Sequence, residues 1–494
     1  MNIEQLIFNH AQATPQKIAL ISGAIEVSYE QLWKEIEKAA IWFCENAERG
    51  DRIVVSASKN IEFVYTYFGA HIAGMICVPI DPETNKIRLK RIIDVANPKL
   101  IVGELRNHGD YDVIPFSNCK SAYSLSANSC VSSVASEQIS NGKFTETFPK
   151  GDDVADLLFT TGTTGLPKGV ALTFANQMAA ADNINTFIGN TADDVEMLAL
   201  PISHSFGLGR LRCVFAKGAT LVLLGSFASM KKFFGEIERC HVTGFGMVPA
   251  SWAYILKMSG DKIGQFAGQL KYIEIGSAFM TLENKQKLMN LLPNTHICMH
   301  YGLTEASRSA FISFHDDQEH LMSAGKASPN TDVAVFSEQG ESLNNNEDGE
   351  ICVKGAHVCS DYWGMPKEEF RKDFFGDYFR TGDWGHVDEN GYIYLVSRKK
   401  EIINVGGKKV SPIEVEEHLN EIDGIEESAC VGVHDDVLGE VVKAFCVCSK
   451  AVDFEEVKKI LFKKIEMYKI PAFFEVIKEL PKTQNGKLQR LLLK

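Results

Sequence analysis

The sequence predicts an α/β protein with a large, layered N-terminal domain and a small α+β C-terminal domain. Over residues 1 to about 310, amphipathic helices alternate with short apolar strands such as 52–56 and 76–80, which is typical of helices layered on sheets. From about 322 to 397 the pattern changes to short strands between turns, which predicts a small β subdomain. Helix–strand alternation resumes after residue 400, and 494 residues are enough for more than one core.

A basic run at 397–401 separates the β region from the last helix–strand segment. We place the domain boundary there, with an N-terminal domain at 1–399 and a C-terminal domain at 400–494. A helix is expected to begin near Ser411 and Pro412, because a serine followed by proline is a typical helix start. About 95 residues are sufficient for a small separate domain.

Charge and composition exclude some classes of partner. A net charge of −13 leaves no basic stripe for a phosphate backbone, so no nucleic-acid partner is expected. The most apolar stretch, 63–79, contains His71 and two glycines, which favours a buried helix leading into a strand over a membrane span. Residues 1–15 lack a signal-peptide pattern and the twelve cysteines form no Cys-x-x-Cys pair, so we predict a cytoplasmic protein with reduced thiols.

The segment 159–170 carries the first chemical signal, a run rich in glycine and threonine that ends in a lysine. Its glycines allow a tight turn, and consecutive amides with the Lys168 ammonium suit a triphosphate. Pro167 before Lys168 excludes the Walker A spacing. A flexible surface loop is the alternative, which the buried run 154–159 disfavours. The residues assigned to phosphate binding are Thr160, Thr161, Gly162, Thr163, Thr164, Gly165 and Lys168.

This run resembles the phosphate loop of the adenylate-forming superfamily, which comprises acyl- and aryl-CoA synthetases, peptide-synthetase adenylation domains and firefly-type luciferases. The resemblance covers nearly the whole chain, because further motifs follow in the family's order. They are 27–32, 73–82, 301–305, 349–355, 380–383 and 480–487. Membership implies an ATP-dependent, AMP-forming enzyme whose cofactors are ATP and Mg²⁺.

The resemblance assigns the loop after strand 297–299 to the nucleotide. Glu305 is then the Mg²⁺ ligand, a role that suits a carboxylate. Thr304 is assigned to the α-phosphate, Tyr301 to adenine, and Gly302 to nucleotide binding. Without the resemblance, a helix-capping carboxylate would be the better interpretation of Glu305.

Two further segments are similar to nucleotide contacts of the family. Asp383 suits the ribose hydroxyls because an ionised carboxylate only accepts hydrogen bonds, and Arg398 is a second ribose or phosphate contact. Gly276, Ser277 and Ala278 match the adenine and acyl wall, although the family more often has a Gly-Gly-Ala-Pro type of segment there.

Lys487 resembles the family's catalytic lysine, which binds the acid carboxylate and the α-phosphate. The carboxylate is already ionised at pH 7, so the reaction needs stabilisation of charge on phosphate and no general base. Lys400 matches the hinge about which the small domain moves, with a basic surface linker as the alternative. Gly406, Gly407 and Lys408 resemble the loop that admits a pantetheine arm.

The acid pocket is predicted around His204, whose segment 201–207 resembles that of acyl- and aryl-CoA synthetases. A core histidine is the alternative. Peptide-synthetase domains have an aspartate here for a substrate ammonium, so we expect an acid without an α-amino group. Phe279 and His300 add bulk, which disfavours long-chain fatty acids. Arg210 and Arg212 are interpreted as solvated or structural, with recognition of a second carboxylate as the alternative.

The predicted function is activation of a carboxylic acid to an acyl-adenylate, followed by transfer to a thiol. CoA is the expected acceptor, and the phosphopantetheine arm of an acyl carrier protein is the alternative. A luciferase-like oxidation has no support in the residues. The residues assigned to catalysis are Lys168, His204, Thr304, Glu305 and Lys487. A non-catalytic nucleotide-binding homologue is disfavoured because Lys168, Thr304, Glu305, Asp383 and Lys487 are all present.

Overall fold

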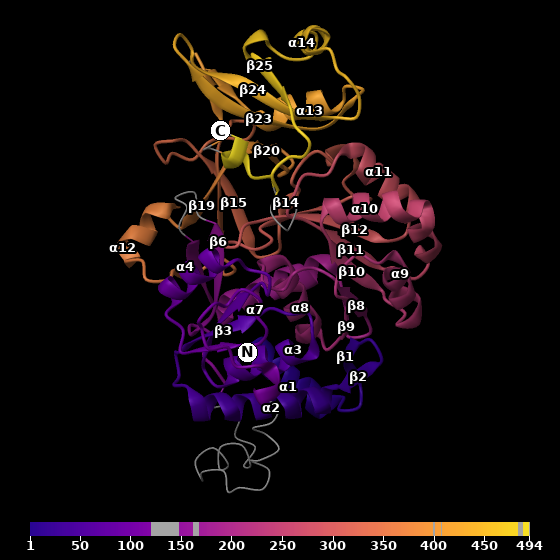
Figure 1. The fold of residues 1–494 in the computed structure, drawn as a ribbon, viewed down its shortest axis with the longest axis vertical. Coiled ribbons are helices and arrows are strands. Elements are labelled where there is room, and N and C mark those ends of the chain that lie inside the picture. Colours follow the sequence, from indigo (N-terminus) through magenta and orange to yellow (C-terminus); the bar gives the residue numbers. More distant parts are fainter. Residues whose placement is uncertain (120–147, 162–166, 399–400, 407, 483–487, 494) are drawn as a thin grey trace, which may run out of the picture. The chain divides into compact units, whose positions relative to one another are not determined.

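The computed structural model describes residues 1–119, 148–161, 167–398, 401–406, 408–482 and 488–493 (Figure 1). The chain divides into two compact units. The first comprises Met1–Leu321, Ala327–Asp332 and Lys354–Asp373, and the second comprises Met322–Lys326, Val333–Val353 and Phe374–Lys494. The predicted α/β class is confirmed. The boundary at residue 400 falls within the second unit and remains a prediction.

The first unit contains a nine-stranded sheet whose central strands are parallel. Its strand order is β14 (Lys326–Ala327), β13 (Ala310–Ser313), β12 (His296–Tyr301), β11 (Tyr272–Ile275), β10 (Gly244–Met247), β8 (Val195–Leu198), β9 (Thr220–Leu223), β1 (Ile18–Ser22) and β2 (Ile25–Ser28). The chain runs from β8 to β9 on one side and then crosses back to β10 on the other. The carboxyl ends of β8 and β10 therefore form a topological switch point, where ligands bind in open α/β sheets.

Helices cover both faces of this sheet. One face is apolar, with Met197, Phe245 and Ile273 in a core shared with the buried residues of α9 (Met230–Arg239), α10 (Pro249–Ser259) and α11 (Leu282–Leu291). The opposite face carries Glu196 and Glu274, which bind α8 (Ser205–Lys217) through Arg210. Helix α7 (Phe174–Ile188) packs against α8.

The second sheet of this unit has six strands. Their order is β17 (Asp361–Tyr362), β7 (Pro167–Thr173), β6 (Val154–Thr161), β4 (Ile76–Ile80), β3 (Arg52–Ser56) and β5 (Leu100–Val102). The accompanying helices are α1 (Ile3–Ala13), α2 (Tyr29–Asn46), α3 (Ile61–Ile72), α4 (Lys86–Ala96) and α12 (Lys367–Phe370). The apolar stretch 63–79 forms most of α3 and β4, as predicted, and no helix among the described residues is long and apolar enough to cross a membrane.

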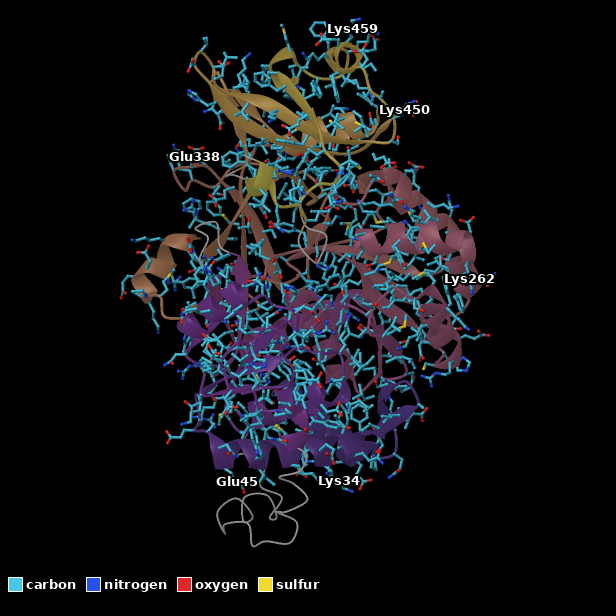
Figure 2. The ribbon with its side chains drawn as sticks, in the orientation of Figure 1. Lys34, Glu45, Lys262, Glu338, Lys450 and Lys459 are labelled. Carbon is cyan, nitrogen blue, oxygen red and sulfur yellow. The ribbon has the colours of Figure 1, made fainter. Side chains whose placement is uncertain are left out.

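Charged side chains such as those of Lys34, Glu45 and Lys262 are exposed and lie at the periphery of the first unit (Figure 2).

The second unit contains two five-stranded sheets. The first consists of β15 (Thr331–Phe336), β16 (Gly349–Gly355), β19 (Tyr378–Val387), β18 (Phe374–Phe375) and β20 (Ile393–Arg398), as expected for the β region. The second consists of β22 (Lys408–Val410), β21 (Ile403–Val405), β24 (Gly439–Cys448), β23 (Ile425–Asp435) and β25 (Phe473–Val476), with α13 (Pro412–Asn420) and α14 (Phe454–Phe462). Ser411 accepts a hydrogen bond from the amide of Glu414, which confirms the predicted helix start.

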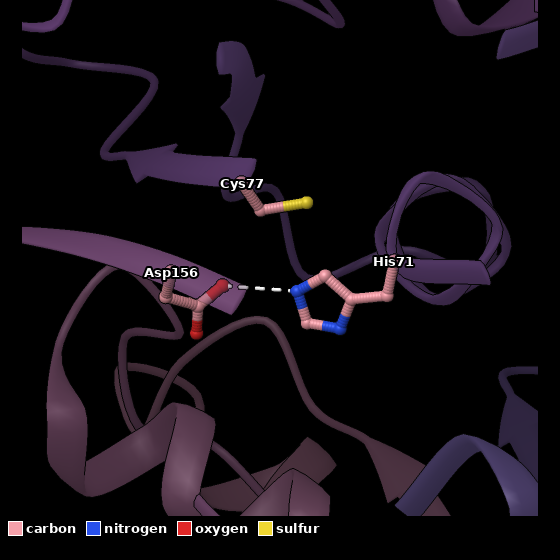
Figure 3. A group of neighbouring side chains, drawn as sticks. All are labelled: His71, Cys77 and Asp156. Carbon is pink, nitrogen blue, oxygen red and sulfur yellow. Dashed lines mark hydrogen bonds and ion pairs between the residues drawn. The ribbon is translucent and has the colours of Figure 1, made fainter. Parts of the chain in front are cut away.

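A buried charge cluster joins α1, α3 and β6 in the first unit. His71 is fully buried, with Nδ1 2.7 Å from Glu4 Oε1 and Nε2 3.1 Å from Asp156 Oδ1 (Figure 3). Burial opposes the charged imidazole, but interactions with Cys77, Asp156 and Glu4 together raise the pKa of His71. Two carboxylates facing both ring nitrogens require both nitrogens to carry protons. His71 is therefore a buried cation.

Cys77, His71 and Asp156 also have the donor types of a metal site, and their ligand atoms lie within 4.8 Å of one another. However, the Arg212 guanidinium forms an ion pair with Asp156 Oδ2, and the Tyr67 hydroxyl donates to the same oxygen at 2.9 Å. The cluster thus already contains its own cations. We interpret it as an internal ion network that holds these elements together.

We predict that His71→Gln lowers the free energy of unfolding by about 3–5 kcal/mol, because the buried Glu4 loses its cation and the buried Asp156 keeps only Arg212. The exposed Lys38→Gln variant, whose partner is Glu35, should lose no more than about 1 kcal/mol. Urea unfolding monitored by circular dichroism measures both values. Adding Glu4→Gln should recover part of the loss, whereas a His71→Gln effect as small as that of Lys38→Gln would contradict the charged cluster.

The same cluster has a pH signature. Because the folded protein holds the His71 proton above pH about 6.5, where the unfolded chain releases it, stability should fall as pH rises through the raised pKa. In His71→Gln, the free energy of unfolding should lack this part of the decrease with pH, which urea unfolding at a series of pH values measures.

Candidate active site

The predicted phosphate loop connects two strands of the six-stranded sheet. Strands β6 and β7 form an antiparallel pair in which Thr160 faces Lys168 and Thr161 faces Pro167. Residues Gly162, Thr163, Thr164 and Gly165 lie outside the described residues. Lys168 lies at the start of β7, and its Nζ is 4.5 Å from the centroid of the Tyr362 ring.

The loop after β12 carries the predicted magnesium ligand. Gly302 is required there, because a Cβ would lie 2.5 Å from the backbone nitrogen of Arg308. The Glu305 carbonyl accepts a hydrogen bond from the Cys359 amide at 2.7 Å, and its Oε1 accepts one from the Tyr362 hydroxyl at 3.0 Å. Lys168, on strand β7, and Glu305, in the loop after β12, therefore both contact Tyr362.

The Glu305 side chain fits a magnesium ligand. It is a partly exposed carboxylate, and within the described residues no cation forms an ion pair with it. Magnesium in nucleotide sites is held by one or two carboxylates together with phosphate oxygens and water. Thr304, the predicted α-phosphate contact, precedes Glu305 and is also partly exposed.

His204 precedes helix α8 at the carboxyl end of β8, beside the switch point. Glycine is required at position 207, where the chain folds back toward Pro201, because a Cβ there would lie only 2.3 Å from the Pro201 carbonyl oxygen. Burial and the charge of Arg88 lower the pKa of His204 against the opposing effect of Asp81. The imidazole is therefore neutral at pH 7 and able to donate or accept a hydrogen bond.

Arg308 joins the loop after β12 to the start of α8. Its Nη1 and Nη2 donate to the carbonyl oxygens of Ser205 and Phe206, both at 2.8 Å, and its Nε donates to Glu274 at 3.1 Å. Gly209 leaves the necessary room, since a Cβ would lie 2.6 Å from Nη1. Arg308 is buried and has a φ of 59°, which a non-glycine residue adopts only when the surroundings impose it. Nothing in the sequence indicated this role.

The two arginines of α8 are structural. Arg210 is fully buried, with Nε 2.7 Å from Glu196 Oε1 and Nη1 3.2 Å from Glu274 Oε2. Arg212 is buried beside Asp156. The structural interpretation is supported and the solvated one is wrong, because these side chains meet carboxylates of the protein itself.

His300 lies against the switch point. Its ring fills the space above Gly276, where a Cβ would lie 2.0 Å from Cε1, and it meets the Phe206 ring edge-on at 4.5 Å between centroids. Nδ1 lies 2.7 Å from Glu274 Oε1. Burial lowers the pKa of His300 more than Glu274 raises it, so the ring is neutral. Phe279, in contrast, is 50% exposed.

The predicted adenine segment follows β11. Ser277 has a φ of 74°, a left-handed conformation that is unfavourable for serine. Such backbone strain is concentrated at binding sites. Gly276 and Ala278 flank this residue, so the three predicted wall residues form a sharp turn at the carboxyl end of the sheet.

The remaining predicted residues belong to the second unit. Asp383 of β19 is buried, and its backbone lies opposite that of Arg398 in the antiparallel pairing of β19 with β20. The Gly406 amide donates to the Leu438 carbonyl at 2.8 Å, and Lys408 Nζ lies 4.6 Å from the Tyr468 ring centroid. Three predicted residues, Lys400, Gly407 and Lys487, lie outside the described residues, so their roles remain predictions.

Residues 7–363 match the AMP-binding enzyme family, and residues 414–487 match the AMP-binding enzyme C-terminal domain. The chain belongs to the AMP-binding enzyme family. It is 30% identical to the long-chain-fatty-acid–CoA ligase of Bacillus subtilis, over 99% of this chain and 93% of the relative. It is 27% identical to the oxalate–CoA ligase of Arabidopsis thaliana, over 99% of this chain and 97% of the relative.

Solved structures of the AMP-binding enzyme family share the fold. The o-succinylbenzoate CoA synthetase of Bacillus subtilis, in complex with its acyl-adenylate intermediate, superposes with a TM-score of 0.86 at 25% identity, covering 99% of this chain and 97% of that one. ATP-bound MatB of Rhodopseudomonas palustris superposes with a TM-score of 0.85 at 24% identity, covering 100% of this chain and 98% of that one. At this identity the likeness shows a shared fold and nothing more. The protein is therefore an adenylate-forming enzyme of the acid–thiol ligase class.

We predict that Arg308→Lys lowers kcat/KM for adenylation by about tenfold to a hundredfold, because lysine keeps the charge beside Glu274 but cannot hold both carbonyls of α8. Pyrophosphate exchange measures this loss. The exposed Arg239→Lys variant, which pairs with Glu236, is the control and should behave as wild type. Full activity of Arg308→Lys would show that the position of α8 does not depend on this contact.

Proposed function

We propose that this enzyme uses ATP to convert a short or ring-shaped carboxylic acid without an α-amino group into its acyl-adenylate, and then transfers the acyl group to CoA. The observation that carries the proposal is the meeting of Lys168 and Glu305 at Tyr362, beside a loop that Arg308 fixes to the His204 helix. The Lys168 cation for phosphate, the Glu305 carboxylate for magnesium and the neutral His204 imidazole thus belong to segments that are joined by direct contacts.

In the first half-reaction the ionised carboxylate of the acid attacks the α-phosphorus of ATP, and pyrophosphate leaves. Negative charge accumulates on the phosphate oxygens, which Lys168, Thr304 and Lys487 would stabilise. Glu305 would hold Mg²⁺, which supplies further positive charge for the triphosphate when bound. The neutral His204 would orient the acid by a hydrogen bond, and no general base is needed.

In the second half-reaction a thiol sulfur attacks the acyl carbon, the thiol proton is released, and AMP leaves with its bridging oxygen. One chain performs both steps, so Lys487 should withdraw after adenylation and the thiol should enter along Gly406, Gly407 and Lys408. Rotation about Lys400 would achieve this, because a few terminal residues can absorb such a motion. The CoA-ligase names of the relatives support CoA over a carrier protein as acceptor.

The preference for a short acid rests on the wall beside His204. His300 covers Gly276 and contacts Phe206, and behind it Glu274 is held by buried arginines. These charges balance one another, so the wall offers no unpaired cation to a second carboxylate of the substrate. We therefore propose that the His300 ring limits the depth available to an acid bound beside His204.

Acid-dependent exchange of pyrophosphate into ATP tests the proposal directly. The panel should contain acetate, propionate, butyrate, benzoate, cinnamate, palmitate and an α-amino acid. CoA or a holo-carrier protein is then added to the best acid, and the thioester is identified by mass spectrometry. Exchange with a short acid and thioester formation on CoA are expected. Exchange that depends on an amino acid would overturn the proposal of an acid without an α-amino group. Thioester formation on the carrier protein alone would overturn the proposal of CoA as acceptor.

We predict that Lys487→Ala lowers adenylation by several hundred-fold but spares transfer to CoA from supplied acyl-AMP. The lysine is needed only while charge builds on the α-phosphate, and such a contact is worth on the order of 3–4 kcal/mol. Single-turnover assays of each half-reaction give the two rates, with Lys482→Ala as the neighbouring control. Equal losses in both half-reactions would refute the role.

We also predict that kcat/KM falls as the acid lengthens, and that His300→Gly reverses this trend for acids that are longer by a few carbons. Each methylene that finds apolar room gains about 0.8 kcal/mol. Phe279→Ala should extend the range less, because that side chain is half exposed. A wild-type preference that rises steadily to sixteen carbons would contradict the short pocket and leave the family assignment intact.

A further inference from the structure

A short segment of the first unit, residues 356–363, connects the magnesium loop to the phosphate-loop strand. On one side the Cys359 amide donates to the Glu305 carbonyl at 2.7 Å. On the other side strand β17 pairs with β7, and the Trp363 amide donates to the Gly169 carbonyl at 2.7 Å. The segment is thus fixed at both ends by backbone hydrogen bonds.

Tyr362 is the residue of this segment that contacts both functional side chains. Its hydroxyl donates to Glu305 Oε1 at 3.0 Å, and its ring centroid lies 4.5 Å from Lys168 Nζ. The side chain is 7% exposed, and Phe370 packs edge-on against its ring at 5.5 Å between centroids. The hydroxyl is the donor in this pair, because a carboxylate only accepts hydrogen bonds.

The two contacts of Tyr362 involve groups of opposite charge, the Lys168 ammonium and the Glu305 carboxylate. The face of an aromatic ring attracts a cation, and a phenolic hydroxyl binds a carboxylate. Lys168 on strand β7 and Glu305 in the loop after β12 carry opposite charges, yet no ion pair joins them, and neither pairs with another charged group within the described ranges. Tyr362 satisfies each one separately without neutralising either charge.

We propose that Tyr362 is a positioning residue that holds Glu305 for magnesium and Lys168 for the triphosphate while keeping these two charges from pairing with each other. Its hydroxyl serves the carboxylate and its ring serves the lysine, so the two functions can be removed separately. The inference rests on the nucleotide roles in the proposed function and is independent of the acid.

Binding of ATP by isothermal titration calorimetry, with Mg²⁺ and with EDTA, tests this division without any acid present. Tyr362→Phe removes only the hydroxyl, so it should raise the Mg²⁺ concentration for half-maximal ATP binding by about tenfold while leaving magnesium-free ATP binding unchanged. Tyr362→Leu also removes the ring, so it should weaken magnesium-free ATP binding by about threefold to tenfold as Lys168 turns toward Glu305.

Two controls separate positioning from a loss of stability. Tyr29→Phe removes another buried hydroxyl, which donates to the Ala219 carbonyl at 2.7 Å, and should change the melting temperature but not the Mg²⁺ requirement. In a Glu305→Gln background, Tyr362→Phe should produce no further change in that requirement. Unchanged Mg²⁺ dependence in Tyr362→Phe, or an equal loss with and without Mg²⁺, would overturn the proposal. A wild type that binds Mg·ATP but activates no acid would refute the proposed function alone.

Discussion

Two buried arginines hold helix α8 between the two sheets of the first unit. Arg210 pairs with Glu196 and Glu274 of the nine-stranded sheet, while Arg212 pairs with Asp156 of the six-stranded sheet. A buried guanidinium tolerates little displacement, because moving it leaves a charge unpaired in a medium of low dielectric constant. The start of α8, and therefore His204, is thus positioned by ion pairs that lie more deeply in the fold.

The same principle extends to the loops at the carboxyl ends of the strands. Arg308 binds backbone carbonyls of α8, and Tyr362 binds the carboxylate of the loop after β12, so buried polar side chains fix the start of α8 and this loop. Loops of this kind carry function because a rigid scaffold positions them. Glycine at positions 209 and 276 leaves room for Arg308 and His300, which links the spacing of small residues to the placement of charged ones.

Much of the architecture could be predicted from local sequence patterns. Strands 52–56 and 76–80 and the start of α13 at Ser411 follow from apolar runs and capping residues, which act within a few positions of the chain. The partners of Arg210, the covering of Gly276 by His300 and the contacts of Tyr362 depend on residues far apart in the sequence, so no local pattern reveals them. Phe279 is assigned to the acid pocket from its segment and its bulk, but the direction of a side chain in a loop is set by tertiary contacts, and Phe279 is half exposed.

The central claim is that the acid attacks the α-phosphorus of ATP before a thiol accepts the acyl group. The most direct measurement uses a short acid labelled with oxygen-18 in its carboxyl group, incubated with the enzyme, ATP, Mg²⁺ and CoA, and determines the mass of the AMP produced. The account predicts that AMP gains one labelled oxygen, because the bridging oxygen of the acyl-adenylate comes from the acid and leaves with AMP. Unlabelled AMP, or ADP together with labelled phosphate, would contradict it.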